Sequence, residues 1–204
     1  MLRVGLTGGY ATGKSFVARE LETHGCHLIY ADKLGHEVLS PGGEAYAPTI
    51  ALFGEDILSP DQTIDRKKLA SLVFGNAELL KQLTELIHPA VFRLEEALMK
   101  RIQGADPKGI VVVEAAILIE TGRYKDYDRV IVTTCSREKQ IIRGMKRDGF
   151  SREEVMQRID RQMPIGEKIP LADYVIHTEG DKEATAAQVS EMYDNLARLA
   201  GQTA

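Results

Sequence analysis

Short apolar segments alternate with helical patterns along most of the chain. Five of these segments are too short for typical helices, and they span residues 2–7, 26–30, 111–113, 130–132 and 174–176. A helical pattern follows the first segment, with Phe16, Val17 and Leu21 on one face. Apolar strands separated by helices are typical of a parallel sheet that is covered on both faces. The pattern therefore predicts an α/β fold with a doubly wound, five-stranded parallel sheet.

Residues 33–108 interrupt this alternation, because they carry several helical patterns and little strand signal. Asp65 and Asn76 stand where N-caps are expected, each before an apolar helical pattern. Pro89 is tolerated in a first helical turn, so it predicts the start of another helix. We interpret residues 33–108 as a helical insertion between the second and third strands.

Residues 136–168 are the second interruption. Ser136 and Ser151 are both placed as N-caps, and the string that begins at Ser151 matches a capping box. The segment is therefore expected to be a helical hairpin, and we call it the arginine hairpin for its composition. The remaining chain should form the core of a single folded unit, at about residues 1–32, 109–135 and 169–204. It is expected to close with an amphipathic helix over residues 182–199.

Residues 8–15, called here the phosphate loop, match the pattern G-x-x-x-x-G-K-[ST] between the first strand and the first helix. In such loops backbone N–H groups turn toward a β-phosphate, and the helix N-terminus adds partial positive charge. We expect Lys14 to reach the β- and γ-phosphates of ATP and the Ser15 hydroxyl to ligate Mg²⁺. A chance glycine turn would not need strand, loop and helix in this order. The expected nucleotide-binding residues are Gly8, Gly9, Ala11, Thr12, Gly13, Lys14, Ser15 and Phe16.

Asp32 follows the second strand, and ligands of doubly wound sheets collect beyond the carboxyl ends of the strands. A carboxylate there could accept the proton of an attacking hydroxyl group. Aspartate is also a common N-cap, here for a helix beginning at Lys33. Position alone leaves catalysis and capping equally open.

Charged residues elsewhere offer further candidates. Glu114 ends the third strand, where it could contact Mg²⁺ or simply be a solvated strand end. Arginines facing a γ-phosphate would stabilise the charge of phosphoryl transfer, whereas arginines paired with nearby acids would form an ordinary surface. We expect most to be paired and one or two, Arg143 first, to act on phosphate. The basic residues of the arginine hairpin are Arg137, Arg143, Lys146, Arg147, Arg152, Arg158 and Arg161.

The composition narrows the class of protein. The formal net charge is −4, from 26 basic and 30 acidic residues, and this argues against a dedicated nucleic-acid binder. Cys26 and Cys135 form no CxxC pair, which fits a reducing compartment. No apolar stretch approaches the ~20 residues of a membrane span, and no export segment is visible. We expect a soluble, cytoplasmic enzyme that acts on a small molecule, with no nucleic-acid, membrane or obligate protein partner.

Several short strings, taken in their order and spacing from about residue 2 to 178, resemble the dephospho-CoA kinase family. They are Gly8-Gly9, Gly13-Lys14-Ser15, Ala31-Asp32 with His36, His88-Pro89, Leu118-Ile119-Glu120, Arg143, Arg147, Gln162, Lys168 and Ala172-Asp173. The resemblance implies transfer of the ATP γ-phosphate to the ribose 3′-hydroxyl of dephospho-CoA, the last step of coenzyme A synthesis. It also implies that Asp32 is the base, that the insertion binds the substrate and that the arginine hairpin is a lid.

Four positions differ from the usual pattern of that family. Ala11 stands in place of glycine, Phe16 in place of a small polar residue, Tyr30 in place of aspartate and Ala116 in place of proline. None of these differences removes a group that the mechanism requires.

Two other functions are compatible with a phosphate loop. One is a different small-molecule kinase, such as a nucleoside monophosphate or shikimate kinase, which would differ in its acceptor. The other is a nucleotide-dependent switch, since residues 32–35 read DxxG as in GTPases. The chain contains no NKxD-type segment to read guanine, and the large insertion favours a kinase.

Overall fold

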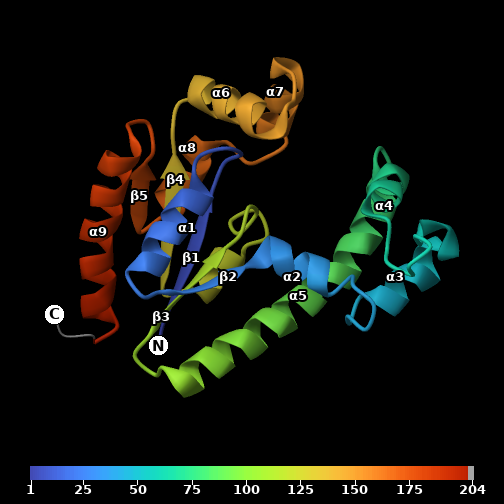
Figure 1. Ribbon diagram of the computed structural model, residues 1–204, viewed down its shortest axis with the longest axis horizontal. Coiled ribbons are helices and arrows are strands. Elements are labelled where there is room, and N and C mark those ends of the chain that lie inside the picture. Colours follow the sequence, from blue (N-terminus) through green and yellow to red (C-terminus); the bar gives the residue numbers. More distant parts are fainter. Residues whose placement is uncertain (202–204) are drawn as a thin grey trace. The chain divides into compact units, whose positions relative to one another are not determined.

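The computed structural model describes residues 1–201 and divides into two compact units (Figure 1). The core unit comprises Met1–Tyr30 and the chain from Arg101 onward. The helical unit is Ala31–Lys100. The phosphate loop and the arginine hairpin belong to the core unit, whereas Asp32 belongs to the helical unit.

The core unit is built on a five-stranded sheet in the order β2-β3-β1-β4-β5 (Figure 1). Every pair of neighbouring strands is parallel, which confirms the predicted α/β sheet. β3 separates β1 from β2, so Glu114 pairs with Leu6 on one side and with Tyr30 on the other. The strands are β1 (Leu2–Gly8), β2 (His27–Tyr30), β3 (Ile110–Glu114), β4 (Arg129–Thr134) and β5 (Tyr174–His177).

Each face of the sheet has its own apolar core. On one face Ile131 packs in a cluster with α1 (Lys14–Thr23) and α9 (Lys182–Leu199). On the other face Val130 packs with Leu118, from the segment that follows β3. Successive side chains of a strand point to opposite faces, so neighbouring residues of β4 serve different cores. The carboxyl ends of the strands are thereby held rigidly at one edge, where the phosphate loop begins.

The arginine hairpin contains α6 (Arg137–Asp148) and α7 (Arg152–Asp160), and it ends with the short helix α8 (Ile165–Lys168). As predicted, the Ser136 side chain caps α6 and Ser151 begins a capping box at α7. Two short 3₁₀ helices also lie in the core unit, at Arg123–Asp126 and Ile169–Leu171.

The helical unit confirms the two capping predictions for the insertion. The Asp65 carboxylate accepts hydrogen bonds from the N–H groups of Lys67 and Lys68, and Asn76 accepts from Leu79. These caps satisfy backbone donors that would otherwise lack partners in the first helical turn. The helices are α2 (Ala31–Glu37), α3 (Tyr46–Phe53), α4 (Arg66–Val73) and α5 (Ala77–Ala105), with a 3₁₀ turn at Glu55–Ile57. The end of α5, from Arg101 onward, belongs to the core unit.

The prediction that Pro89 starts a helix is wrong, because Pro89 lies inside α5. Proline lacks an N–H group and removes one hydrogen bond from the helix interior. The buried residues of α5 include Leu83 before the proline and Ala90, Val91 and Met99 after it. This apolar stripe continues past Pro89, and we infer that its burial offsets the lost hydrogen bond.

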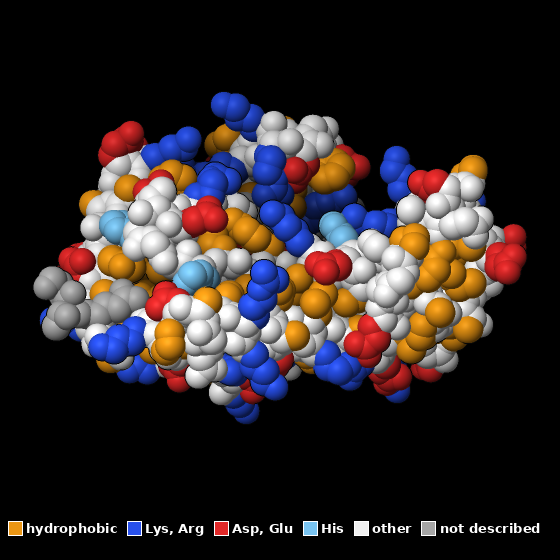
Figure 2. All heavy atoms as spheres, turned by 60° about the horizontal axis from the view of Figure 1, so that its bottom comes forward, with side chains coloured by type: hydrophobic (Ala, Val, Ile, Leu, Met, Phe, Trp, Pro, Cys, Tyr) orange, Lys and Arg blue, Asp and Glu red, His pale blue; other side chains and the backbone are white. Residues whose placement is uncertain are grey.

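Within residues 1–201, no helix is both long and apolar enough to cross a membrane. Acidic and basic side chains are both scattered over the face drawn in Figure 2. The nearly balanced charges of the sequence are therefore also mixed on this surface.

Candidate active site

The phosphate loop is shaped by residues with unusual backbone requirements. A Cβ on Gly8 would overlap the Thr133 hydroxyl, so the close approach of β1 to β4 excludes a side chain there. Gly13, with φ of 88°, and Ala11, with φ of 55°, both adopt the left-handed region. That region costs a non-glycine residue about 1 kcal/mol or more. Ala11 therefore holds a strained turn at a position where glycine would be relaxed.

Thr12 supports the loop from inside. Its hydroxyl donates to Gly9 O at 2.8 Å and lies 2.8 Å from the Thr133 hydroxyl. The Thr12 side chain is completely buried. Thr12, one of the predicted nucleotide-binding residues, therefore supports the loop from within, and its N–H also donates to Gly9 O, at 3.4 Å.

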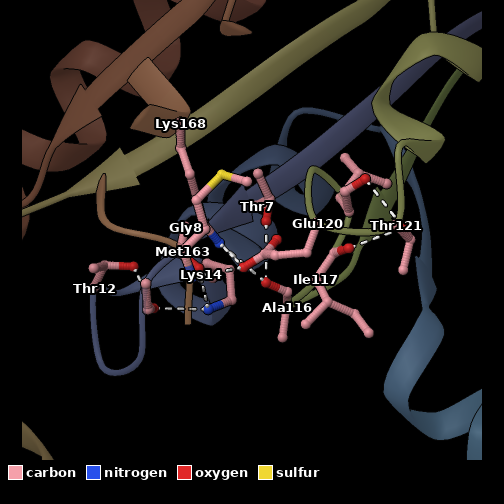
Figure 3. A network of polar contacts seen from close by, with 12 residues as sticks. Thr7, Gly8, Thr12, Lys14, Ala116, Ile117, Glu120, Thr121, Met163 and Lys168 are labelled. Carbon is pink, nitrogen blue, oxygen red and sulfur yellow. Dashed lines mark hydrogen bonds and ion pairs between the residues drawn. The ribbon is translucent and has the colours of Figure 1, made fainter. Parts of the chain in front are cut away.

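Lys14 lies across its own loop. Its Nζ donates to Gly9 O at 2.9 Å and to Gly8 O at 3.3 Å (Figure 3). Both acceptors are backbone carbonyl oxygens of the phosphate loop, so the ammonium group lies against the loop itself. An anion placed in the loop would offer this cation a stronger partner than a neutral carbonyl.

Ser15 and Glu114 lie together at the carboxyl edge of the sheet. The Ser15 hydroxyl donates to Glu114 Oε1 at 3.2 Å. Hydroxyl and carboxylate oxygens are the hard ligands that Mg²⁺ prefers. The donor set present fits a magnesium ion, which supports the predicted role of Ser15 and adds Glu114 as a neighbour.

Arg143 of α6 is attached to the start of the β5–α9 connection. Its guanidinium donates to Thr178 Oγ1 at 2.9 Å and to Thr178 O at 2.7 Å. The Thr178 hydroxyl in turn donates to Thr12 O at 2.8 Å. Arg143 is thereby joined to the phosphate loop through one residue, and its charge lies on the side of Gly13.

A cavity of about 170 Å³ adjoins the helix end of the phosphate loop. Its walls include Gly13, Phe16, Arg143, Thr178 and Lys182. The Phe16 ring suits a flat heteroaromatic group. The predicted residue Phe16 therefore lies where a nucleotide base could be held.

Tyr10, in the middle of the phosphate loop, reaches the arginine hairpin. Its hydroxyl donates a hydrogen bond to the Asp148 carboxylate, and the Arg147 guanidinium lies 5.0 Å from the ring centroid. The bond from Arg147 holds the pKa of Asp148 at about 2 and raises that of Arg147. Burial, and then the bond to Asp148, raises the pKa of Tyr10. These contacts join the phosphate loop to the C-terminal end of α6.

Three of the seven basic residues of the hairpin form ion pairs with its acidic residues. Arg137 lies 2.8 Å from Asp160, and Arg152 lies 2.6 Å from Glu138. Both pairs join α6 to α7 and so hold the hairpin together. The third is Arg147, which binds Asp148 at 2.8 Å.

A second cavity, of about 350 Å³, separates the phosphate loop from the arginine hairpin. Gly9 lines it from the loop, Arg137 and Gln140 from α6, and Gln162 and Met163 from the segment after α7. Gly9 of the loop thus faces the hairpin across this cavity.

Asp32 is exposed and is the second residue of α2. Of the two roles left open for Asp32, the N-cap of a helix beginning at Lys33 is excluded, because α2 begins at Ala31. A carboxylate in a first helical turn still has a favourable interaction with the helix dipole. The structure thus groups Lys14, Ser15, Phe16 and Arg143 within the core unit, and places Asp32 in the helical unit directly after β2.

Sequence reasoning missed two contributors to this site. Thr178 carried no signal, since a lone threonine after a strand has no distinctive pattern. Tyr10 occupied a variable position of the loop motif, and its partner Asp148 is 138 residues away. A separate network at Lys168 and Glu120 was recognised only as part of the family resemblance.

Comparison with known proteins gives a consistent result. The family model for dephospho-CoA kinase matches residues 2–184. A dephospho-CoA kinase of Syntrophus aciditrophicus is 41% identical, over 96% of this chain and 83% of its own length. That of Geobacter metallireducens is 42% identical, over 95% of this chain and 96% of its own.

Solved structures agree in fold. Protein TT1252 from Thermus thermophilus has a TM-score of 0.84 and 30% identity, with coverage of 100% of this chain and 98% of its own. Dephospho-CoA kinase from Campylobacter jejuni has a TM-score of 0.65 and 25% identity, covering 96% and 97%. A shikimate kinase from Bacteroides thetaiotaomicron shares the fold at 13% identity, with a TM-score of 0.53 over 96% of this chain and 98% of its own. This chain belongs to the dephospho-CoA kinase family.

Proposed function

We propose that the protein transfers the γ-phosphoryl group of ATP to the ribose 3′-hydroxyl of dephospho-CoA, giving coenzyme A and ADP. The main support for the proposal is the phosphate loop of a chain that belongs to this family. In this loop Lys14 donates to Gly9 O, and Ser15 donates to the Glu114 carboxylate. The loop supplies a nucleotide site, and the family supplies the acceptor.

ATP is held along the phosphate loop. The backbone N–H groups of the loop and the N-terminus of α1 surround the β-phosphate, and Lys14 bridges the β- and γ-phosphates. The adenine base occupies the cavity beside Phe16 and Thr178. Arg143 lines that cavity and contributes positive charge on the side of Gly13, which stabilises negative charge on the phosphates during transfer.

Ser15 and Glu114 would hold Mg²⁺, Ser15 directly and Glu114 directly or through water. When bound, the ion neutralises charge on the β- and γ-phosphates. The residues themselves orient the phosphate chain, because both stand on rigid elements, α1 and β3.

Asp32 receives the proton of the acceptor. The 3′-oxygen forms a bond to the γ-phosphorus, the bond to the β–γ bridging oxygen breaks, and the hydroxyl proton passes to the Asp32 carboxylate. Support for this role comes from its exposed position directly after β2 and from the family resemblance. The helical insertion that follows Asp32 binds the rest of dephospho-CoA, and the arginine hairpin closes over the phosphates.

The partner is therefore a small molecule, and the place of action is the cytoplasm. Cys26 and Cys135 are free thiols, which suits a reducing compartment.

An acceptor panel tests the proposal. ADP should form rapidly from ATP and Mg²⁺ when dephospho-CoA is added, and slowly with AMP, CMP, UMP or shikimate. Comparable turnover with any of those four would overturn the acceptor while leaving a kinase. Rapid phosphate release from ATP or GTP without any acceptor would instead indicate a nucleotide switch.

A further inference from the structure

Lys168, the last residue of α8, has a completely buried side chain, with 0% exposure. Lysine is almost never fully buried unless its charge is paired. Its Nζ lies 2.6 Å from Glu120 Oε1 and donates to Ala116 O at 3.4 Å (Figure 3). Neither Lys168 nor Glu120 belongs to the phosphate loop or lines the nucleotide cavity.

The pair connects three segments that surround the phosphate loop. Glu120 Oε1 also accepts the N–H of Met163, at the end of the arginine hairpin, at 3.3 Å. Ala116 O also accepts the hydroxyl of Thr7 at 3.4 Å. Thr7 directly precedes the phosphate loop, and Ala116 comes two residues after Glu114. One ammonium group thus links the end of β1, the segment after β3 and the base of the hairpin.

Stability alone is a weak explanation for this arrangement. Taking an ammonium and a carboxylate out of water costs several kcal/mol each, and an apolar pair of similar size is often as stable. Glu120 Oε2 is buried and has no hydrogen-bond partner among residues 1–201, so the carboxylate is only partly compensated. What the ion pair offers beyond an apolar contact is a fixed position, because its distances and donor directions are specific.

We propose that Lys168 and Glu120 are positioning residues, which fix the base of the arginine hairpin against the phosphate loop. The proposal rests on the phosphoryl transfer proposed above, in which the hairpin closes over ATP. Closed lids exclude water from the reacting groups. A hairpin whose base can shift should therefore admit water as a competing acceptor and lower the rate of transfer to the alcohol.

The double variant Lys168→Met/Glu120→Gln tests this proposal. It removes both charges together, so no unpaired charge remains buried. Glutamine keeps an acceptor for the Met163 N–H, and methionine keeps the length of the lysine stem. We expect the double variant to melt within a few degrees of the wild-type protein.

The decisive readout is the ratio of ADP formed to coenzyme A formed. Partial unfolding lowers both products together and leaves the ratio unchanged, whereas a misplaced lid raises it. We expect a ratio near one for the wild type and a severalfold larger excess of ADP for the double variant. Its kcat for coenzyme A should fall roughly tenfold or more, since small misplacements of reacting groups are costly. Its KM for ATP should change by less than about threefold, because the phosphate loop is intact.

The pair Arg129 and Asp173 provides the matched control. Asp173 accepts the N–H of Val130 at 2.7 Å and lies 3.9 Å from Arg129, but both side chains are exposed, at 37% and 42%. Arg129 is the first residue of β4, so the pair lies at the opposite end of that strand from the phosphate loop. Arg129→Met/Asp173→Asn should therefore keep the wild-type ratio and rate.

Each outcome bears on one proposal. A wild-type ratio and rate in Lys168→Met/Glu120→Gln would overturn the positioning role. So would a lower rate with an unchanged ratio. If the double variant does not melt cooperatively, Lys168→Met alone is measured by the same ratio and decides in the same way, because the Glu120 side chain that remains is 22% exposed. A wild-type protein that forms no coenzyme A from dephospho-CoA would instead overturn the proposed function.

Discussion

The Ser15 hydroxyl donates a hydrogen bond to the Glu114 carboxylate, with 3.2 Å between Oγ and Oε1. The two residues are 99 positions apart and meet because β3 pairs with β1, with Glu114 in register with Leu6. The sheet therefore brings two hard oxygen ligands to the edge where the phosphate loop begins. The sequence offered both residues as candidates for Mg²⁺, Ser15 from its motif and Glu114 from its strand end, and the strand pairing explains why their side chains meet.

Glu114→Gln should weaken the dependence of activity on Mg²⁺. The substitution keeps the size of the side chain and an acceptor for Ser15, and it removes the negative charge. We expect the Mg²⁺ concentration for half-maximal ADP formation to rise about tenfold or more, the usual cost of losing a metal-supporting group. The measurement is a MgCl₂ titration of the rate with ATP and dephospho-CoA. Glu22→Gln, on the exposed face of α1, is the control, and an unchanged titration for Glu114→Gln would remove this residue from the metal site.

Lys14→Ala should lower kcat/KM by on the order of a hundredfold or more, because a preorganised charge is lost from a phosphate site. The fold should tolerate the change, since the Lys14 ammonium donates to carbonyl oxygens of its own loop, at Gly8 and Gly9. Steady-state rates beside a thermal melt provide the measurement. A near-normal rate would mean that the phosphate loop does not hold ATP.

Much of the core unit could be predicted from local pattern. The five strands, the helix after the phosphate loop and the capped helices α4, α6 and α7 all follow from apolar periodicity or capping residues. Pro89 shows where a local rule fails, since the apolar stripe of α5 keeps the helix continuous across it. Local propensity is a weak prior, and tertiary burial overrides it.

The site residues that could be predicted from the residues alone are those that belong to one continuous motif. Lys14 and Ser15 follow from eight consecutive residues, whereas Tyr10 with Asp148 and Lys168 with Ala116 meet across 138 and 52 residues. Such contacts depend on how the sheet brings separate segments together. At Asp32 the sequence left two roles open, and the role as an N-cap is excluded because the helix begins at Ala31, two residues before Lys33.

The contribution of Asp148 to stability should depend on pH. Hydrogen bonds, first from Arg147 and then from Tyr10, hold its folded-state pKa at about 2, below the ~3.9 of an unfolded aspartate. A lowered folded-state pKa means that the stabilisation is fully present above pH ~4 and is lost as pH falls toward 2. Asp148→Asn should therefore be less stable than the wild type at pH 7, and the difference should shrink between pH 4 and 2. Denaturant unfolding at several pH values measures the free energy of unfolding of both proteins. A difference that stays constant from pH 7 to pH 2 would show that ionisation of Asp148 does not stabilise the fold.

Asp32→Asn separates a catalytic role for Asp32 from a structural one. Asparagine keeps the size of the side chain and removes the carboxylate that would accept the proton. Single-turnover transfer should fall by roughly a hundredfold to ten-thousandfold, the usual scale for general-base catalysis. The lower end is expected, because proton transfer comes late in a loose phosphoryl transfer. The thermal melt and the ATP titration should stay near wild type, since Asp32 is exposed and the phosphate loop is a separate set of contacts.

Glu37→Gln is the matched control for this experiment, because Glu37 is an exposed acid at the other end of the same helix, α2. Its rate should equal that of the wild type, which would show that loss of any charge from α2 is not enough to slow transfer. If Asp32 serves only through the dipole of α2, Asp32→Asn should cost a few tenths of a kcal/mol of stability and leave the rate unchanged. An unchanged single-turnover rate would therefore remove Asp32 from the mechanism. A slow rate that coincides with weaker ATP binding would instead place its effect on the nucleotide, and the proton would need another acceptor.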